Sequence, residues 1–286
     1  MNPFLKFGYH LTAMTKYITF LLLSGITMLT GCTVRSYYLS PFNASSNPYQ
    51  AKPLVSDSSK SATYLTGSLY RGSANYHSRD DVFSAQGGIQ RGHTFKNIQA
   101  SYGLNAFAGT YKVHAYDTMI PPFNPDDSYV NFPAINAGAG RNHYEGLALN
   151  GSINGVLPFG NGNEWRFVGV ETVIGKEYGK YASFRKDLPD SAANAIYRDD
   201  RIGSWSVTSE LIMNDHAGSS FGLKLAIGRS FYRTDVIGDA EKSYIQPSFF
   251  SFGIHYIRRK PVYYLKYNAS DYSSGIQLGV NYRIGK

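Results

Sequence analysis

The side chains between residues 214 and 220 are of the types that carry hydrolytic chemistry. Asn214, Asp215 and His216 are followed closely by Ser219 and Ser220. A histidine that takes the proton of a nearby hydroxyl is the standard way to activate a serine nucleophile. The same run is also rich in Asn, Asp and Gly, which build tight turns between strands. The sequence favours the turn, and we expect no catalytic residue in this chain.

The sequence gives little evidence for a metal site or a phosphate-binding site. His77 lies near Asp80 and Asp81, but the spacing matches no recognised metal site. The glycine-rich run 137–140 opens no predicted helix, and it lacks the Lys-Ser or Lys-Thr pair of a phosphate-binding loop. We therefore expect neither a metal site nor a cofactor.

Cys32 is the single cysteine, so an intrachain disulfide is excluded. Lys16 and an apolar run over residues 17–29 precede it, followed by small residues. A cationic start, an apolar stretch and small residues are the three parts of a secretory signal peptide. We expect residues 1–31 to be that signal.

The run Leu29-Thr30-Gly31-Cys32 resembles the lipobox of bacterial lipoproteins. The resemblance implies diacylation of the Cys32 thiol, cleavage before Cys32 and acylation of the freed amine, with palmitate as an acyl group. It also implies handling by the lipoprotein-processing machinery. Thr33 stands where an inner-membrane lipoprotein has Asp, which implies the outer membrane of a Gram-negative bacterium.

Residues 32–60 are rich in Ser, Asn, Pro and Lys and show no sustained hydrophobic period. This composition is typical of a flexible tether. We expect it to lead from a lipidated Cys32, in the inner leaflet of the outer membrane, to a folded domain at residues 61–286.

That domain alternates apolar and polar residues with a period of two, which predicts strands with two different faces. The pattern is clearest over residues 98–106, 220–230 and 276–284. About ten strands follow from it. Their approximate ranges are 61–71, 82–91, 97–113, 144–157, 164–178, 203–213, 220–232, 247–258, 261–269 and 274–285.

Long and short connections alternate between these strands, except at the last one. Outer-membrane barrels have this parity, with short periplasmic turns at one end and long extracellular loops at the other. The sequence therefore predicts an all-β fold: an antiparallel up-and-down transmembrane β-barrel of about ten strands, within a range of eight to twelve.

The last strand resembles the C-terminal assembly signal of small Gram-negative outer-membrane β-barrels. Gln277, Gly279, Tyr282 and Ile284 follow that pattern, although two residues, Gly285 and Lys286, come after it. The resemblance implies recognition by the outer-membrane assembly machinery.

A soluble lipid-anchored β-sandwich or lipocalin-like binding domain is the alternative fold, since its strands alternate equally well. The polar faces decide between the two. They consist mainly of Gly, Ser, Asn and Gln, which suit a crowded, hydrogen-bonded barrel interior better than a charged surface. We favour the membrane barrel.

Five charged residues then point into the lumen. Glu171, Glu210 and Lys224 fall on three consecutive predicted strands, and Lys266 and Arg283 lie farther round the wall. Buried charges need partners, because an isolated one is expensive to desolvate. We interpret them as a structural salt-bridge network, with an ion-selective gate as the other reading.

Composition limits the function further. Aromatic residues make up 15% and charged residues 17%, which excludes a disordered chain. The formal net charge is +8, but Lys and Arg are interspersed with Asp, so no nucleic acid is expected as a partner.

We expect a closed or narrow barrel in contact with outer-membrane lipid. It would act in surface binding or envelope structure, through loops that meet an unidentified extracellular ligand. An outer-membrane lipid-modifying hydrolase is a further alternative.

Overall fold

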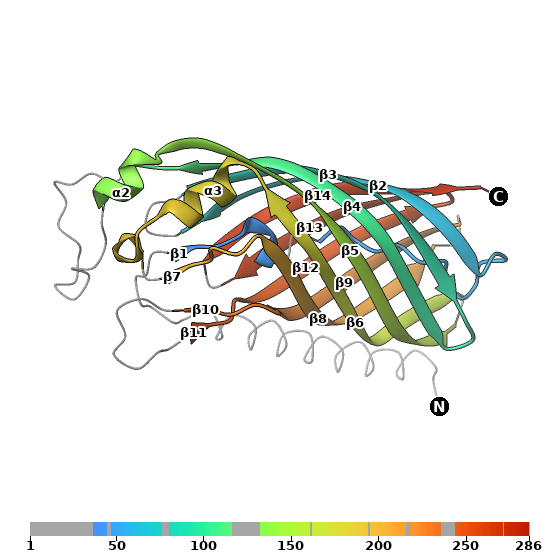
Figure 1. Cartoon of the computed structure of the whole chain (residues 1–286). Coiled ribbons are helices and arrows are strands. Elements are labelled where there is room, and N and C mark those ends of the chain that lie inside the picture. Colours follow the sequence, from blue (N-terminus) through green and yellow to red (C-terminus); the bar gives the residue numbers. More distant parts are fainter. Residues whose placement is uncertain are drawn as a thin grey trace, which may run out of the picture. The chain divides into compact units, whose positions relative to one another are not determined.

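Ten strands close into a single antiparallel barrel, which confirms the predicted fold class (Figure 1). The computed structural model describes residues 37–44, 47–75, 80–115, 132–160, 162–193, 195–215, 218–235, 244–270 and 272–285. Around the barrel the strands follow the order β12-β13-β14-β2-β3-β4-β5-β6-β8-β9, and β9 pairs with β12 to complete the ring. The sheet therefore has no free edge, which removes the unpaired backbone groups that a bilayer cannot satisfy.

The barrel strands are β2 (Ser61–Ala74), β3 (Asp80–Thr94), β4 (Ile98–Val113), β5 (Gly140–Phe159), β6 (Asn163–Tyr178), β8 (Arg201–Asn214), β9 (Ser219–Ser230), β12 (Ser248–Arg258), β13 (Pro261–Ser270) and β14 (Ser273–Ile284). Each corresponds to one of the predicted ranges, and several are longer at their ends.

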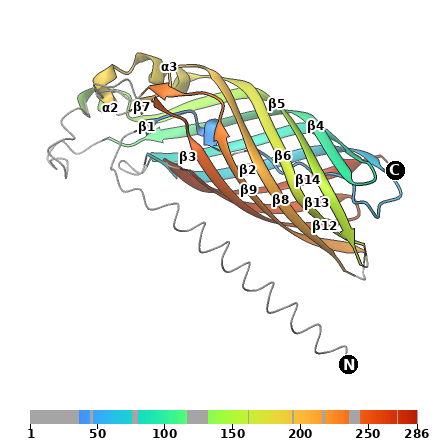
Figure 2. The same ribbon diagram turned by 90° about the horizontal axis from the view of Figure 1, so that it is seen from below.

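The two ends of the barrel differ. At one end the connections are short turns, and both the start of β2 and the end of β14 lie there. The longer connections lie at the other end of the barrel, and we call this end the long-loop end (Figure 2). They carry α2 (Phe132–Ala137), α3 (Lys180–Asp187), the 3-10 helix η3 (Asp190–Ala192), β7 (Ala195–Ile196) and the paired strands β10 (Thr234–Asp235) and β11 (Tyr244–Ile245).

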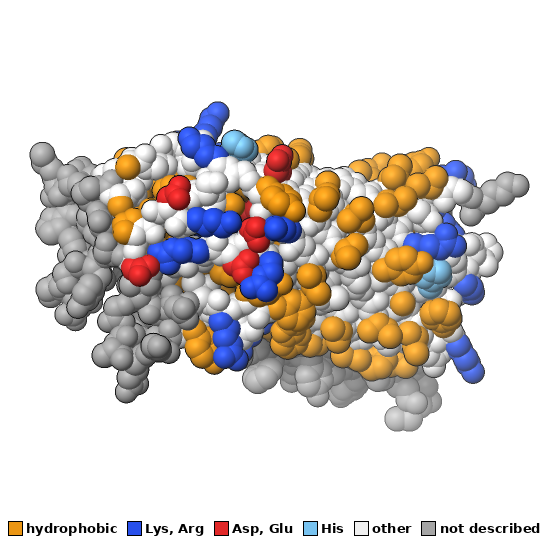
Figure 3. All heavy atoms as spheres, in the orientation of Figure 1, with side chains coloured by type: hydrophobic (Ala, Val, Ile, Leu, Met, Phe, Trp, Pro, Cys, Tyr) orange, Lys and Arg blue, Asp and Glu red, His pale blue; other side chains and the backbone are white. Residues whose placement is uncertain are grey.

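Apolar side chains cover the outside of the barrel. Leu69, Leu149 and Ile227 expose 54%, 63% and 64% of their surface, and many other large apolar residues on the strands are similarly exposed. Figure 3 shows these side chains over the strands, with charged ones gathered toward the long-loop end and at the rim of short turns. A surface this apolar is unfavourable in water and matches the hydrocarbon of a bilayer.

Polar side chains face inward instead. Gln90, Gln99, Asn105, Gln277 and Asn281 are all at most 2% exposed. The barrel is therefore apolar outside and polar inside, which is the transmembrane arrangement. The soluble sandwich or lipocalin-like alternative, which needs its apolar face inward, is wrong.

Gly279 shows why the last strand needs glycine at this position. It pairs with Tyr264 on β13, and a Cβ at Gly279 would meet the Tyr264 Cζ atom at 2.3 Å. The Tyr264 ring, 5% exposed, lies over the space that the missing side chain leaves. The glycine of the expected assembly pattern thus has a packing role inside the finished barrel.

The segment expected to be a flexible tether lies inside the barrel. It begins with β1 (Tyr37–Tyr38) and the 3-10 helix η1 (Pro41–Ala44). Tyr38 and Phe42 are at most 1% exposed, and most residues from 48 to 54 are buried too. We call residues 37–44 and 47–55 the lumen segment. The flexible-tether prediction is wrong for these residues, because the barrel encloses them and side chains of its wall replace water as their hydrogen-bond partners; residues 32–36 lie outside the described part of the chain.

Candidate functional site

The lumen segment starts at the long-loop end, where it is held by the connection between β6 and β8. Tyr37 and Tyr38 pair in parallel with Ala195 and Ile196 of β7. The Tyr197 amide donates to the Tyr38 carbonyl oxygen at 2.9 Å. Backbone pairing of this kind makes the segment a strand of the loop structure rather than a chain passing beside it.

Helix α3 adds side-chain contacts to the same stretch. The Tyr181 hydroxyl donates to the carbonyl oxygen of Leu39 at 3.2 Å. The Tyr38 ring meets the Phe184 ring edge-on, with centroids 5.6 Å apart. Burial raises the pKa of the Tyr181 phenol far above its ordinary value, so this donor keeps its proton at all physiological pH values.

A buried ion pair joins α3, β6 and the lumen segment. Arg185 Nη2 lies 3.0 Å from Glu177 Oε1, and both side chains are at most 1% exposed. The other Glu177 oxygen accepts a hydrogen bond from the Ser40 hydroxyl. The Arg185 guanidinium also lies 4.9 Å from the centre of the Tyr181 ring, a cation–π distance. The loop helix, the wall and the lumen segment therefore share one polar cluster.

Below this cluster Phe42 enters the barrel. Its ring stacks on Phe107 of β4 with centroids 3.7 Å apart. Phe107 points inward from the wall and is 3% exposed. The pair forms an apolar layer between the loop cluster and the charged layer beneath it.

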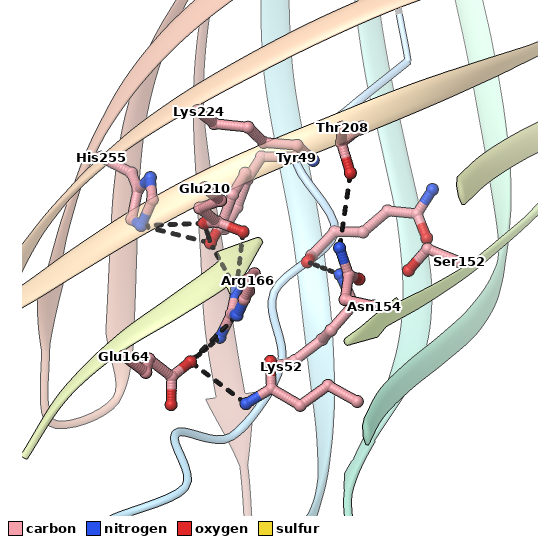
Figure 4. A network of polar contacts seen from close by, with 12 residues as sticks. Tyr49, Lys52, Ser152, Asn154, Glu164, Arg166, Thr208, Glu210, Lys224 and His255 are labelled. Carbon is pink, nitrogen blue, oxygen red and sulfur yellow. Dashed lines mark hydrogen bonds and ion pairs between the residues drawn. The ribbon is translucent and has the colours of Figure 1, made fainter. Parts of the chain in front are cut away.

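The charged layer is built around Arg166 of β6 (Figure 4). Its Nη1 donates to Glu210 Oε2 at 2.9 Å, and its Nε donates to Glu164 Oε1 at 2.9 Å. All three side chains are at most 1% exposed. One guanidinium thus bridges carboxylates on two strands, which the planar fork of N–H donors of an arginine allows.

Tyr49 of the lumen segment completes this layer. Its hydroxyl donates to Glu210 Oε1 at 2.5 Å and accepts from Arg166 Nη1 at 3.3 Å. The same Glu210 oxygen lies 3.1 Å from His255 Nε2 of β12, and the His255 ring stacks on Tyr49 at 4.6 Å. Tyr49 therefore bonds to the centre of the charge network rather than passing by it.

A β-bulge explains why sequence reasoning missed Arg166 and Glu164. In the β6–β8 ladder Arg166 pairs with Glu210 and Gly169 with Thr208, so two residues of β6 oppose one of β8. Before the extra residue the even-numbered residues of β6 face the lumen, and after it the odd-numbered residues do. Both Arg166 and Glu171 then face the lumen, whereas strict alternation from Glu171 places Arg166 outside. Two consecutive apolar residues, Phe167 and Val168, are the signal in the sequence that marks the bulge.

All five charged residues predicted for the lumen point inward. Lys224 forms an ion pair with Glu171, and the two side chains are 10% exposed. Glu210 pairs with Arg166, as described above. Lys266 donates to the carbonyl oxygen of Asn47, and Arg283 lies 3.0 Å from Asp57 just before β2. The five predicted charges therefore do not bond to one another as a single network. Two of them, Lys266 and Arg283, bond instead to Asn47 and Asp57 of the N-terminal region, which the sequence analysis did not place in the barrel.

The lower part of the lumen segment is hydrogen-bonded to the wall near the short turns. The Pro53 carbonyl oxygen accepts from Thr94 Oγ1 at 2.5 Å and from Gln99 Nε2 at 2.9 Å. The Val55 amide donates to Glu164 Oε2 at 2.7 Å. Contacts thus run from the long-loop end to the short-turn end.

Little open space remains around Tyr49. A cavity of about 30 Å³ lies between Tyr49, Lys224 and the strands β9, β12 and β13. That volume holds about two water molecules. The lumen segment therefore leaves room beside Tyr49 for little more than water.

The other candidate residues fall only partly within the described part of the chain. His216 and His77 lie outside it. Asp80 accepts hydrogen bonds from the Tyr111 hydroxyl at 3.0 Å and the His114 amide at 2.9 Å, and Ser220 bonds to Asn214. Within the described ranges, no group of three His, Cys, Asp or Glu side chains is arranged to hold a metal ion. None of the helices in those ranges has the length and apolarity to cross a membrane.

No protein-family model matches the sequence, and neither does any curated protein. Among solved structures, the chain is similar to the translocator domain of the autotransporter NalP from Neisseria meningitidis, with 9% identity and a TM-score of 0.38 over 81% of this chain and 91% of that one. It is also similar to the β domain of the Bordetella autotransporter BrkA, with 10% identity and a TM-score of 0.40 over 79% and 100%. Ail, the attachment invasion locus protein of Yersinia pestis, is 9% identical with a TM-score of 0.22 over 78% and 97%. The strand pairing itself, and not these distant similarities, establishes the barrel.

Proposed function

We propose that this chain is a closed β-barrel of a Gram-negative outer membrane, acting in surface binding or envelope structure through its long-loop end. One observation carries the proposal: the lumen is occupied by the chain's own lumen segment, which is buried and bonded to the wall along its length. A barrel filled in this way is unsuited to general diffusion, so the loops are left as the part that meets other molecules.

The long-loop end offers a surface suited to that role. Arg198, Arg201, Tyr232 and Arg233 line an open pocket of about 580 Å³. The Arg201 guanidinium lies 5.3 Å from the centre of the Tyr232 ring. Arg201 also donates to Asp199 and holds the pKa of that carboxyl at about 2, so the pair stays charged over the physiological range. Charged and aromatic groups side by side support binding of a polar ligand.

Conductance measurements test the closed lumen. Purified protein in planar bilayers is expected to show little or no steady conductance, because Tyr49 and its charged partners occupy the cross-section. Sustained large openings, like those of a trimeric porin, would refute the proposal. Heat-modifiable gel migration of the same sample shows that the barrel tested is folded.

We propose in addition that Cys32 carries the acyl anchor implied by the lipobox. The chain has no other cysteine whose thiol could carry the lipid. Labelled palmitate is expected to enter the wild-type protein and to be lost from Cys32→Ala. Undiminished labelling of that variant would show that the acyl group, if present, lies elsewhere.

A further inference from the structure

The direction of the lumen segment determines where the N-terminus leaves the barrel. The segment pairs with β7 at the long-loop end and reaches β2 at the short-turn end (Figures 1 and 2). Its contacts descend in the same order: Ser40 with Glu177 near the loops, Tyr49 with Glu210 lower down, and Val55 with Glu164 near the turns. The chain therefore enters the lumen from the long-loop end.

We propose that the protein displays its N-terminus on the cell surface, so that an acyl anchor on Cys32 is inserted in the outer leaflet of the membrane that the barrel spans. The inference rests on the proposed outer-membrane location, in which long loops face outward and short turns face the periplasm. It replaces the sequence-based expectation of an anchor in the inner leaflet.

Chain length supports this placement. Five peptide units separate Cys32 from Tyr37, and a fully extended chain of that length spans at most about 18 Å. The apolar band of an outer-membrane barrel is about 25 Å tall. With Tyr37 paired to β7 among the long loops, Cys32 cannot reach the leaflet at the short-turn end by any route.

The contacts at the start of the segment keep it there. Tyr38 is fully buried and Phe42 is 1% exposed. Leu39 and Ser40 are bonded to Tyr181 and Glu177, both of which belong to the β6–α3 region. Withdrawal of the segment toward the periplasm would break these bonds and expose both rings, while leaving Glu177 and Arg185 without Ser40.

Barrel closure provides a route to this topology. The first barrel strand, β2, pairs with the last, β14, over residues 63–74 and 273–284. This seam forms only when the final strand is available, so the lumen segment can be enclosed as the sheet closes around it. No passage through a finished pore is required.

Protease access on intact cells tests the inference. A short site for a specific protease is inserted in full-length protein between Val34 and Arg35. Matched insertions are placed between Lys186 and Asp187, at the exposed end of α3, and between Asp215 and His216, in a short turn. Protease added to intact cells is expected to cut the first two proteins and to cut the third only after permeabilisation. The N-terminal site should also be cut in Cys32→Ala, because the fold and not the lipid places it.

The outcomes separate this inference from the proposed function. Cutting at 186–187 on intact cells, with cutting at 34–35 only after permeabilisation, would overturn surface display and leave the outer-membrane barrel in place. No cutting at 186–187 on intact cells would instead contradict the proposed orientation. If the N-terminal insertion prevents folding, Ser36→Cys is labelled with a maleimide on a polymer too large for porins. Labelling on intact cells supports display, and labelling only after permeabilisation or denaturation overturns it.

Discussion

Replacement of Arg166 by methionine is expected to lower the free energy of unfolding by about 3–5 kcal/mol, the usual cost of removing one partner from a buried ion pair. Arg166 is the cation that bridges Glu164 and Glu210, and none of the three is more than 1% exposed. Without it, the two carboxylates lose the cation bonded to both of them, and the bonds left to them come from Tyr49, the Val55 amide, Gln99 and His255. Methionine keeps much of the side-chain volume, so loss of charge and of hydrogen bonds dominates the effect. The measurement is the unfolding midpoint of refolded protein, in urea or by heat-modifiable gel migration.

The matched control is Lys176→Met, which breaks an ion pair between a cation and a carboxylate at the surface. Lys176 lies 3.1 Å from Asp200, but its side chain is 50% exposed, and such surface pairs contribute less than about 1 kcal/mol. Adding Glu164→Gln and Glu210→Gln to Arg166→Met should recover part of the lost stability, since the uncompensated charges are then gone. An equal loss in the lysine and arginine variants, or no rescue by the glutamines, would show that Arg166 acts through packing alone.

Removal of the lumen segment is expected to turn a closed barrel into a conducting one. Deletion of residues 37–56, which joins Ser36 to Asp57, removes Phe42, Tyr49 and every backbone group that bonds to the wall between the loops and the turns. The exposed wall carries Glu171, Lys224 and Arg166, all of which favour a hydrated lumen once water can enter. Eight strands are just filled by wall side chains, so ten strands without the segment leave room for ions. Planar-bilayer recordings should show steady openings that the wild type lacks.

Deletion of residues 116–131, in the connection between β4 and β5, serves as the control, because it shortens the chain by a similar amount and leaves residues 37–56 present. This variant should remain closed. Heat-modifiable migration establishes that each deletion variant has folded. A milder change, Tyr49→Ala, is expected to give brief openings, since it removes only the side chain at the charged layer. A folded deletion variant that stays closed would show that wall side chains alone seal the lumen.

Much of the barrel can be read from local pattern. The alternation over residues 220–230 and 276–284 predicts β9 and β14 to within about two residues. This works because each strand residue faces either lipid or lumen, and the choice follows from parity along the chain. Loop-length parity likewise places the long connections at one end. The inward direction of Glu171, Glu210 and Lys224 follows from the same rule.

The partners of these charges cannot be read in that way. Arg166 faces inward because a bulge at Phe167 and Val168 shifts the parity of β6, and a one-residue shift moves every following side chain to the other face. Glu210 therefore pairs with Arg166, while its ladder neighbour Lys224 turns to Glu171. Such a choice among nearby charges depends on distances in the closed barrel.

The sequence alone determined the transmembrane barrel, its strand number and the separation of long from short connections, since these depend on alternation and spacing within each hairpin. Only the tertiary structure decided that residues 37–55 occupy the lumen and enter it from the long-loop end. Tyr38, Phe42 and Tyr49 have no periodic spacing, because the wall surrounds the segment on all sides and no face of it is left exposed to water. A segment that is buried on every side shows no alternation of apolar and polar residues in its sequence. Its burial can be seen only in the closed barrel, where the ten strands surround it.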